Sequence, residues 1–315
     1  MKTNSLKIGN LQVDNNVFLA PIAGYTDYPF RQVALKTGYG LCFTELVSAK
    51  GLIYGGRANA ELCYCGDDID KTSVQIFGSD LFAMRTACES EYLRPFKIID
   101  INMGCPVPKV YKNGDGVALL NDLHKAGQII SECVKSGKII TVKTRTGLKQ
   151  GDDFATEFAK MAEDSGASLI TIHGRVREMY YSGEVDYDAI YKAKKSVKIP
   201  VIANGGIFTI EDANEMVENT GCDGIMLARG GLANPFLASQ ILGIDRKITL
   251  QEFILSHLEN LKNYYSPRRS VLEFRKFVSY YFKGIENIKE VKMQLYSCED
   301  IDKMREIIIE IFNKI

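Results

Sequence analysis

Several features that would assign this 315-residue chain to a special class are absent from its sequence. Residues 1–6 contain no apolar segment of the kind found in secretory signals. No run of residues approaches the roughly 20 apolar positions that a membrane-spanning helix needs. We therefore expect a soluble, cytoplasmic protein that carries no targeting segment and does not bind a membrane.

Cysteine and histidine are also arranged in a way that argues against two classes of site. The eight cysteines lack the regular spacing of a disulfide framework, which suggests reduced thiols in a cytosol. Cys63 and Cys65 flank a single residue, and only three histidines exist to complete a metal site. Since the paired C-x-x-C spacing of zinc and iron-sulfur sites is missing, we expect no metal.

The chain has no excess of charge of either sign, because 39 basic residues balance 39 acidic ones. No overall electrostatic field therefore indicates a polyanionic partner, although a local basic patch is still compatible with nucleic acid. Hydrophobic residues make up 46% of the chain, which is enough for one large core.

Eight short apolar runs recur before Pro235, with amphipathic segments between them. The amphipathic segments repeat apolar residues at intervals of three and four, as helices packed on one face do. Alternating strands and helices are typical of a parallel sheet, and eight such units close a barrel. We predict an α/β fold with a (β/α)8 TIM barrel over residues 1–240. The predicted strands are 17–20, 41–44, 73–77, 98–101, 139–142, 169–172, 201–203 and 224–227, and the predicted helices include 118–135, 153–165, 187–195 and 210–219.

Polar residues and glycines cluster at or just beyond the ends of these predicted strands. In this fold the loops at the C-terminal ends of the strands build the active site, whereas the opposite face serves stability. One polar residue at a strand end carries little weight, but many around one mouth predict a site with cations, amides and a thiol. In chain order they are residues 21–24, Glu45, Gln75, Asn102, Cys105, Lys143, Arg145, His173, Arg175, 204–206 and 229–231.

Cys105 follows the fourth predicted strand and has the clearest chemical role. Gly104 lets the backbone turn sharply and Pro106 fixes its exit direction, so the thiol should lie on a stiff loop. The alternative is a buried structural cysteine, which is common for a lone cysteine. Because the ordinary pKa of a thiol is about 8.5, Cys105 would be protonated at neutral pH and able to donate a proton to carbon. We predict that it is a general acid.

Strand patterns cease after Pro235, and residues 241–315 are predicted to form a small all-α domain with helices at 250–265, 270–281, 288–295 and 300–312. One part of this domain combines basic residues with Tyr264, Tyr265 and Phe274. Such a combination suits a phosphate backbone, although a solvated helix face has a similar composition. The basic residues are Lys262, Arg268, Arg269, Arg275 and Lys276.

Glycine pairs follow the last two predicted strands, where this barrel usually binds phosphate through backbone amides and a helix N-terminus. They occur in Asn204-Gly205-Gly206 and Arg229-Gly230-Gly231. No G-x-G-x-x-G motif follows an early strand, so a Rossmann dinucleotide site is not expected. The phosphate-bearing ligand would then be a mononucleotide or a phosphosugar. Gln75, Lys143 and His173 favour a flavin, whose reduced form carries negative charge near N1, and we predict FMN.

Five stretches of the barrel carry the most specific motifs of the chain: residues 19–27, 100–106, 142–147, 172–175 and 201–206. In order along the chain they resemble the tRNA-dihydrouridine synthases, and the sequence around Asn102 is most similar to the bacterial B-type. The resemblance implies an FMN-dependent enzyme with a helical tRNA-binding domain. It would reduce the C5=C6 bond of specific uridines in tRNA, in the D-loop, with NADPH as electron donor or NADH in its place.

The resemblance also implies roles for individual residues. Cys105 would supply the proton, and Asn102 would bind the target base. We assign Arg145 and Arg175 to substrate binding as well. We expect all five basic residues of the C-terminal segment to contact tRNA phosphates, and we name Arg268 and Arg269 among the substrate-binding residues. Gly206 and Ala228 depart from the Asp and Gly that the family commonly has there. The implied cofactor residues are Pro21, Ile22, Ala23, Gln75, Lys143, His173, Asn204, Gly205, Gly206, Ala228 and Arg229.

Three other functions are compatible with parts of this pattern. An FMN oxidoreductase of the dihydroorotate or dihydropyrimidine type would act on a free small pyrimidine and leave the basic helical segment without a role. A phosphosugar aldolase would use Lys143 as a Schiff base without flavin. A tRNA-binding protein with vestigial catalysis would not need an intact set of polar residues at the mouth. We expect a monomer.

Overall fold

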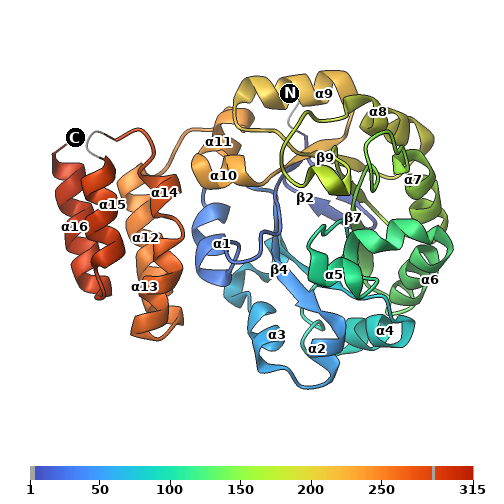
Figure 1. Ribbon diagram of the computed structural model, residues 1–315, viewed down its shortest axis with the longest axis horizontal. Coiled ribbons are helices and arrows are strands. Elements are labelled where there is room, and N and C mark those ends of the chain that lie inside the picture. The colour runs from blue at the N-terminus through green and yellow to red at the C-terminus, as the bar shows by residue number, and fades with distance from the viewer. Residues whose placement is uncertain (1–3, 286–287, 315) are drawn as a thin grey trace.

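Eight parallel strands close into a barrel in the computed structural model, which describes residues 4–285 and 288–314 (Figure 1). Each strand pairs with the next along the chain, and the last pairs with the first. All eight predicted strands are confirmed. They are β3 (Val17–Leu19), β4 (Leu41–Ser48), β5 (Thr72–Phe77), β6 (Ile98–Met103), β7 (Ile139–Arg145), β8 (Ile170–His173), β9 (Val201–Asn204) and β10 (Gly224–Leu227).

Helices surround the barrel, and several begin at an aspartate that accepts a backbone N–H from the first turn, such as Asp80 and Asp186. The predicted helix at 118–135 is wrong at its start. Asp122 caps a helix there, and the preceding residues form a separate 3-10 turn, η2 (Gly116–Asn121). The helices are α1 (Tyr28–Leu35), α2 (Ala49–Ile53), α3 (Arg57–Leu62), α4 (Leu81–Glu89), α5 (Pro108–Lys112), α6 (Leu123–Val134), α7 (Ala155–Asp164), α8 (Tyr187–Ser196), α9 (Ile210–Thr220), α10 (Arg229–Ala233) and α11 (Leu237–Leu242).

Side chains along each strand alternate between the barrel interior and the helix layer. In β6, Ile99, Ile101 and Met103 belong to the hydrophobic cluster under the helices. Ile98 belongs to a second cluster inside the barrel. Asp100 and Asn102 share the inward side of the strand with Ile98, above the apolar layer. The interior is therefore apolar at one end and polar at the other.

An N-terminal hairpin, which the sequence analysis did not predict, closes the apolar end. Its strands β1 (Leu6–Ile8) and β2 (Leu11–Val13) pair antiparallel across a two-residue turn, in which Gly9 has a φ of +58°. Ile8 and Val13 belong to the same cluster as the interior residues Phe18 and Ile202. With this end filled, the C-terminal ends of the strands form the open mouth.

The C-terminal helices form a group beside α1 and α10, on one side of the barrel (Figure 1). They are α12 (Leu250–Tyr264), α13 (Pro267–Arg275), α14 (Val278–Tyr281), α15 (Ile288–Ser297) and α16 (Ile301–Asn313). The single helix predicted at 270–281 is wrong. It starts earlier, because Pro267 suits the first turn, and it is interrupted between Arg275 and Val278. The predicted domain boundary at residue 240 falls within α11.

Aromatic rings join the C-terminal helices to the barrel. Phe30 of α1 stacks on Phe277, with ring centroids 5.1 Å apart, and meets Phe253 edge-on. His257 is fully buried among these rings, and its Nδ1 lies 2.8 Å from the Tyr281 hydroxyl. Burial lowers the pKa of His257 to about 3, so it packs as a neutral ring. The two parts share one continuous hydrophobic cluster.

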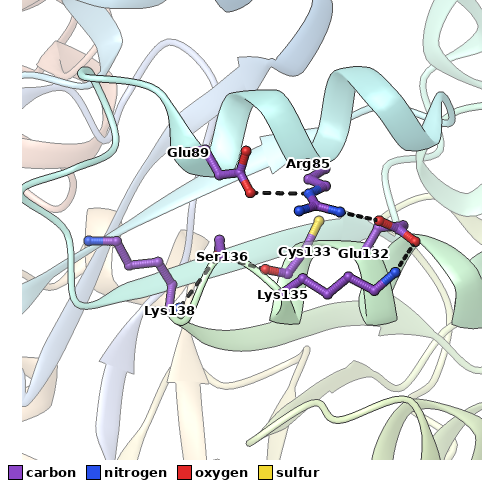
Figure 2. A network of polar contacts seen from close by, with 7 residues as sticks. All are labelled: Arg85, Glu89, Glu132, Cys133, Lys135, Ser136 and Lys138. Carbon is purple, nitrogen blue, oxygen red and sulfur yellow. Dashed lines mark hydrogen bonds and ion pairs between the residues drawn. The ribbon is translucent and has the colours of Figure 1, made fainter.

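Ion pairs connect α4 and α6 on the outer surface (Figure 2). The Arg85 guanidinium lies 3.1 Å from Glu89 and 3.3 Å from Glu132, which also pairs with Lys135. Such exposed pairs contribute at most about 1 kcal/mol each. None of these residues lines the barrel mouth.

Among the described residues, no helix is both long enough and apolar enough to span a membrane.

Replacing Phe277 by alanine should destabilise the protein by about 3–5 kcal/mol, because it removes a fully packed ring between the barrel and the C-terminal helices. Urea denaturation measures this change. Phe82 on α4, whose side chain is 73% exposed, provides the control, and its alanine variant should change stability by about 0.5 kcal/mol or less. Equal effects of the two substitutions would contradict this account of the interface.

Candidate active site

A cavity of about 330 Å³ opens at the C-terminal ends of the strands. Most barrel residues that the sequence placed at the mouth line it, whereas Arg268 and Arg269 do not. Gly24, Glu45 and Gly231, also predicted at the mouth, are not part of the lining, and Glu45 accepts a hydrogen bond from the Gly24 backbone. The predicted residues that meet here are Pro21, Ile22, Ala23, Gln75, Asn102, Cys105, Lys143, Arg145, His173, Arg175, Asn204, Gly205, Gly206, Ala228 and Arg229.

The cavity lining is cationic. Lys143 and three arginines line it, and no aspartate or glutamate does so among the residues that the structure describes. Burial, followed by the charge of Arg145, lowers the pKa of Lys143 to about 8. Burial and the surrounding cations hold the pKa of His173 well below its usual value, so its ring is neutral at neutral pH. The cavity therefore favours the binding of an anionic ligand.

Backbone carbonyls, not carboxylates, position the arginines. Arg145 donates from Nε to the Gly104 carbonyl at 2.9 Å. Arg175 donates from Nε and Nη2 to the Gly183 carbonyl, at 3.0 and 2.7 Å. Arg229 donates from Nη2 to the Tyr181 carbonyl at 2.8 Å. Because no carboxylate of residues 4–285 and 288–314 forms an ion pair with these side chains, their positive charge remains available to a ligand.

The side chain of Lys143 on β7 is oriented by Asn204 on β9, two strands further along the barrel. Its Nζ donates to Asn204 Oδ1 at 2.9 Å, and Asn204 Nδ2 donates to the Met226 carbonyl at 2.7 Å. Strand register places Lys143 beside Asn102, and Asn204 beside both His173 and Met226. The ammonium group is thus held toward the centre of the cavity with further hydrogens to donate.

The two glycine-containing loops approach their neighbours closely. A Cβ on Gly230 would lie 2.0 Å from the Ile207 carbonyl oxygen, and one on Gly205 would lie 2.7 Å from the His173 ring. Gly206 has a φ of +73°, a conformation that favours glycine and would strain an aspartate. Ala228 has a φ of −118° and a ψ of −107°, which lies outside the main α and β regions. The loop conformation therefore accommodates the glycine at position 206, whereas nothing in it explains the alanine at position 228.

Cys105 lies on the wall of the cavity as a partly buried free thiol. Burial raises its pKa, so it remains protonated at neutral pH. Its backbone N–H donates to Asn102 Oδ1 at 2.9 Å, and its carbonyl accepts from the Val117 N–H at 3.3 Å. The loop that carries the thiol is thus fixed from two sides. No group of three or more metal-ligating side chains occurs among the residues described.

The amides of Gln75 and Asn102 are hydrogen-bonded to each other. Asn102 Nδ2 donates to Gln75 Oε1 at 2.9 Å, and Gln75 Nε2 donates to Asp100 Oδ2 at 2.6 Å. Each NH2 group has a second hydrogen, which is available for a ring that enters the cavity.

Several aromatic residues that line the cavity were not predicted from the sequence, among them Tyr25, Tyr181 and Tyr280. Tyr25 follows β3, and its ring meets that of Tyr280 edge-on with centroids 5.7 Å apart. Tyr280 belongs to α14, so the C-terminal helices reach the mouth of the barrel. Tyr25 lies inside one of the family-like stretches and could have been found there, whereas no local pattern distinguishes Tyr280 from a packed helix residue.

The basic segment of the C-terminal helices is largely paired within the protein. Lys262 lies 2.5 Å from Asp302, and Lys276 pairs with Glu273. Arg269 lies 2.7 Å from Glu61 and stacks over the Tyr265 ring at 3.9 Å. Arg275 donates to the Cys298 carbonyl at 3.0 Å. Arg268 is exposed, and no ion pair or hydrogen bond within the described residues involves its side chain.

Comparison with known proteins gives a consistent result. Residues 18–315 match the family model described as dihydrouridine synthase. The chain is 34% identical over 321 residues to a probable tRNA-dihydrouridine synthase of Rickettsia bellii, covering 98% of both chains. It is 36% identical over 291 residues to tRNA-dihydrouridine synthase B of Pasteurella multocida, covering 89% of this chain and 88% of that protein.

Solved structures share the fold at low sequence identity. Morphinone reductase has a TM-score of 0.54 and 12% identity, covering 76% of this chain and 89% of that chain. The old yellow enzyme homologue from Zymomonas mobilis has a TM-score of 0.53 and 14% identity, covering 76% and 92%. At this identity the likeness supports the TIM-barrel fold alone.

Proposed function

Because the chain belongs to the dihydrouridine synthase family, a family of oxidoreductases, we propose that it reduces the C5=C6 bond of a uridine in tRNA. The observation that carries this proposal is the protonated thiol of Cys105 on the wall of a cationic cavity. Such a cavity selects an anionic cofactor and substrate, and the thiol supplies a proton to a carbon held beside it.

We propose FMN as the cofactor. The donor set fits its two polar ends: Arg229 and the loop at 204–206 would hold the ribityl phosphate, and Gln75, Lys143 and His173 would contact the ring. Pro21, Ile22 and Ala23 would pack against the flavin. Bound there, FMN would supply hydride-transfer chemistry between NADPH, or NADH in its place, and C6 of uracil.

The chain's own residues would then handle the substrate. The Lys143 cation would lie near the negative charge of the reduced ring, while neutral His173 adds no charge of its own. Asn102 would hold the target uracil, with Arg145 and Arg175 near the entrance. Hydride addition at C6 leaves negative charge over C5 and the C4 carbonyl, and the Cys105 thiol would protonate C5. The resulting thiolate regains its proton from solvent.

The target uridine must leave its stack to reach the cavity, which costs least for an unpaired loop base. We therefore propose an unpaired loop base as the target, and the family resemblance implies a uridine of the D-loop. The helices that reach the mouth through Tyr280 would hold the tRNA, with phosphate contacts from Arg268 and Arg269. We propose that the enzyme works as a cytoplasmic monomer.

The direct test uses purified protein, NADPH and tRNA that lacks dihydrouridine. Mass spectrometry of the digested tRNA should find a uridine that has gained two hydrogens. Free uracil and orotate, each offered instead of tRNA, test the reductase of small pyrimidines. Turnover of a free base without turnover of tRNA would replace the proposed function with that alternative.

Lys143 should make flavin binding depend on pH. Its pKa of about 8 means that the side chain is cationic below pH 8 and loses its charge above it. If the cation holds the anionic cofactor, the Kd for FMN should rise by up to tenfold per pH unit above roughly pH 8. Fluorescence titration of cofactor-free protein measures this. The Lys143→Met variant should bind more weakly with a flatter profile, and a wild-type Kd that is constant from pH 7 to 9 would contradict the role.

The Cys105→Ala variant should retain FMN and still oxidise NADPH, but its rate of tRNA reduction should fall by a factor of about 10² to 10⁴, as expected when a general acid is removed. Stopped-flow spectroscopy separates flavin reduction from its reoxidation by tRNA. The matched control is Cys298→Ala, the other partly buried thiol. Near-normal tRNA reduction by Cys105→Ala would leave the residue with a structural role only.

Replacing Arg268 and Arg269 together by alanine should raise the KM for tRNA and flatten its salt dependence. Each phosphate that the variant no longer neutralises should change the slope of log affinity against log salt by about 0.7 to 0.9. Arg268→Ala should account for most of this effect, because Arg269 is already paired with Glu61. Lys262→Ala, in the same segment but paired with Asp302, is the control. If the double variant binds tRNA with an unchanged salt slope, these arginines do not contact the RNA.

A further inference from the structure

Asp100 is a fully buried carboxylate inside the barrel. On β6 it is the inward-facing residue before Asn102, and it therefore lies just below the cavity lining. Strand register places it between Gln75 of β5 and Thr141 of β7. Its Oδ2 accepts from Gln75 Nε2 at 2.6 Å, and its Oδ1 accepts from the Thr141 hydroxyl at 2.5 Å. It does not line the cavity. A buried carboxylate is costly, so its presence requires partners that use its charge or its acceptor oxygens.

The hydrogen bonds above Asp100 run in one direction. A carboxylate only accepts, so the NH2 group of Gln75 must face it and the Gln75 oxygen must face Asn102. The Asn102 NH2 group donates to that oxygen, which turns the Asn102 oxygen toward the following loop. There it accepts the backbone N–H groups of Gly104 and Cys105, at 3.2 and 2.9 Å.

The same orientations follow from the opposite end. The Cys105 N–H can only donate, so the Asn102 oxygen must face it. The Asn102 NH2 group then faces the Gln75 oxygen, and the Gln75 NH2 group faces Asp100. The chain of bonds therefore has a donor fixed at the thiol loop and an acceptor fixed at Asp100. Removing Asp100 would leave the Gln75 NH2 group without its buried acceptor, so that the Gln75–Asn102 pair would be held from the loop side alone.

We propose that Asp100 is a positioning residue, which sets the orientation of Gln75 and Asn102 and thereby holds the Cys105 backbone in place. This inference rests on the proposed function, in which Cys105 delivers the proton. The relevant property of Asp100 is acceptor geometry rather than charge. An asparagine can supply the same acceptor, since its oxygen can face Gln75 while its NH2 group faces the Thr141 hydroxyl.

The first test measures the thiol loop itself and needs neither cofactor nor RNA. Alkylation of Cys105 by iodoacetamide is followed by mass spectrometry, with Cys298 as internal reference. In Asp100→Leu the loop loses its anchor, and Cys105 should react roughly fivefold faster or more. Asp100→Asn should stay within roughly twofold of wild type, and so should Thr141→Val, which removes the other bond to the same carboxylate.

The second test uses the FMN-loaded enzyme. Two rates are compared with wild type: reduction of the flavin by NADPH and its reoxidation by tRNA. In Asp100→Leu, reoxidation should slow by a factor roughly tenfold or more greater than reduction does, because the proton donor acts only during reoxidation. Asp100→Asn should restore reoxidation. Should the leucine variant fail to fold, Gln75→Leu interrupts the same series of bonds and is judged by the same ratio.

Three results would overturn the inference: equal slowing of both steps, unchanged alkylation together with unchanged reoxidation, or an asparagine variant that behaves like the leucine variant. The last result would assign the role to the charge of Asp100. A wild-type enzyme that forms no dihydrouridine contradicts the proposed function instead, and the alkylation test still decides whether Asp100 fixes the loop.

Discussion

The alternation of side chains along eight closed parallel strands is the constraint on which the site depends. Inward positions of neighbouring strands are register partners, apart from a register shift between Phe43 and Leu46 of β4, so layers of side chains form inside the barrel. The N-terminal hairpin completes the lowest, apolar layer with Ile8 and Val13. The next layers contain Asp100, then Lys143 and Asn102. A change of register by one residue in any strand would turn its functional side chain into the helix layer.

The two polar layers inside the barrel differ in charge. The upper layer contains cations without carboxylates, whereas Asp100 lies below it with neutral partners, Gln75 and Thr141. Its charge still acts on Lys143 and opposes the effect of burial on the lysine pKa. This arrangement keeps Lys143 cationic near neutrality without placing a carboxylate where an anionic ligand would bind. A carboxylate in the upper layer would neutralise the arginines and repel the phosphate.

The sequence predicted the barrel and the composition of the cavity lining, because buried parallel strands are apolar runs and their ends carry the polar residues. It did not predict the hairpin, whose three-residue strands are too short for a periodic signal. The pairing of Lys276 with Glu273 is local, but the pairing of Arg269 with Glu61 of α3 joins segments far apart in sequence and could not be predicted from local patterns. Tyr280 reached the cavity lining through tertiary packing alone. Local patterns determine elements, whereas contacts between distant segments decide which charges stay free.

The contact between Tyr25 and Tyr280 links the two parts of the molecule at the place where chemistry is proposed. Tyr25 continues the loop whose residues Pro21 to Ala23 would pack on the flavin, and Tyr280 belongs to helices anchored through Phe277 and Phe30. Because this anchor is a stack of buried rings, the C-terminal helices have little freedom to rotate against the barrel. An RNA held by those helices would therefore present its loop at a fixed distance from Cys105. Under the proposed function, selection of the target uridine would then follow from the rigid spacing between the phosphate contacts and the cavity, rather than from reading of the base alone.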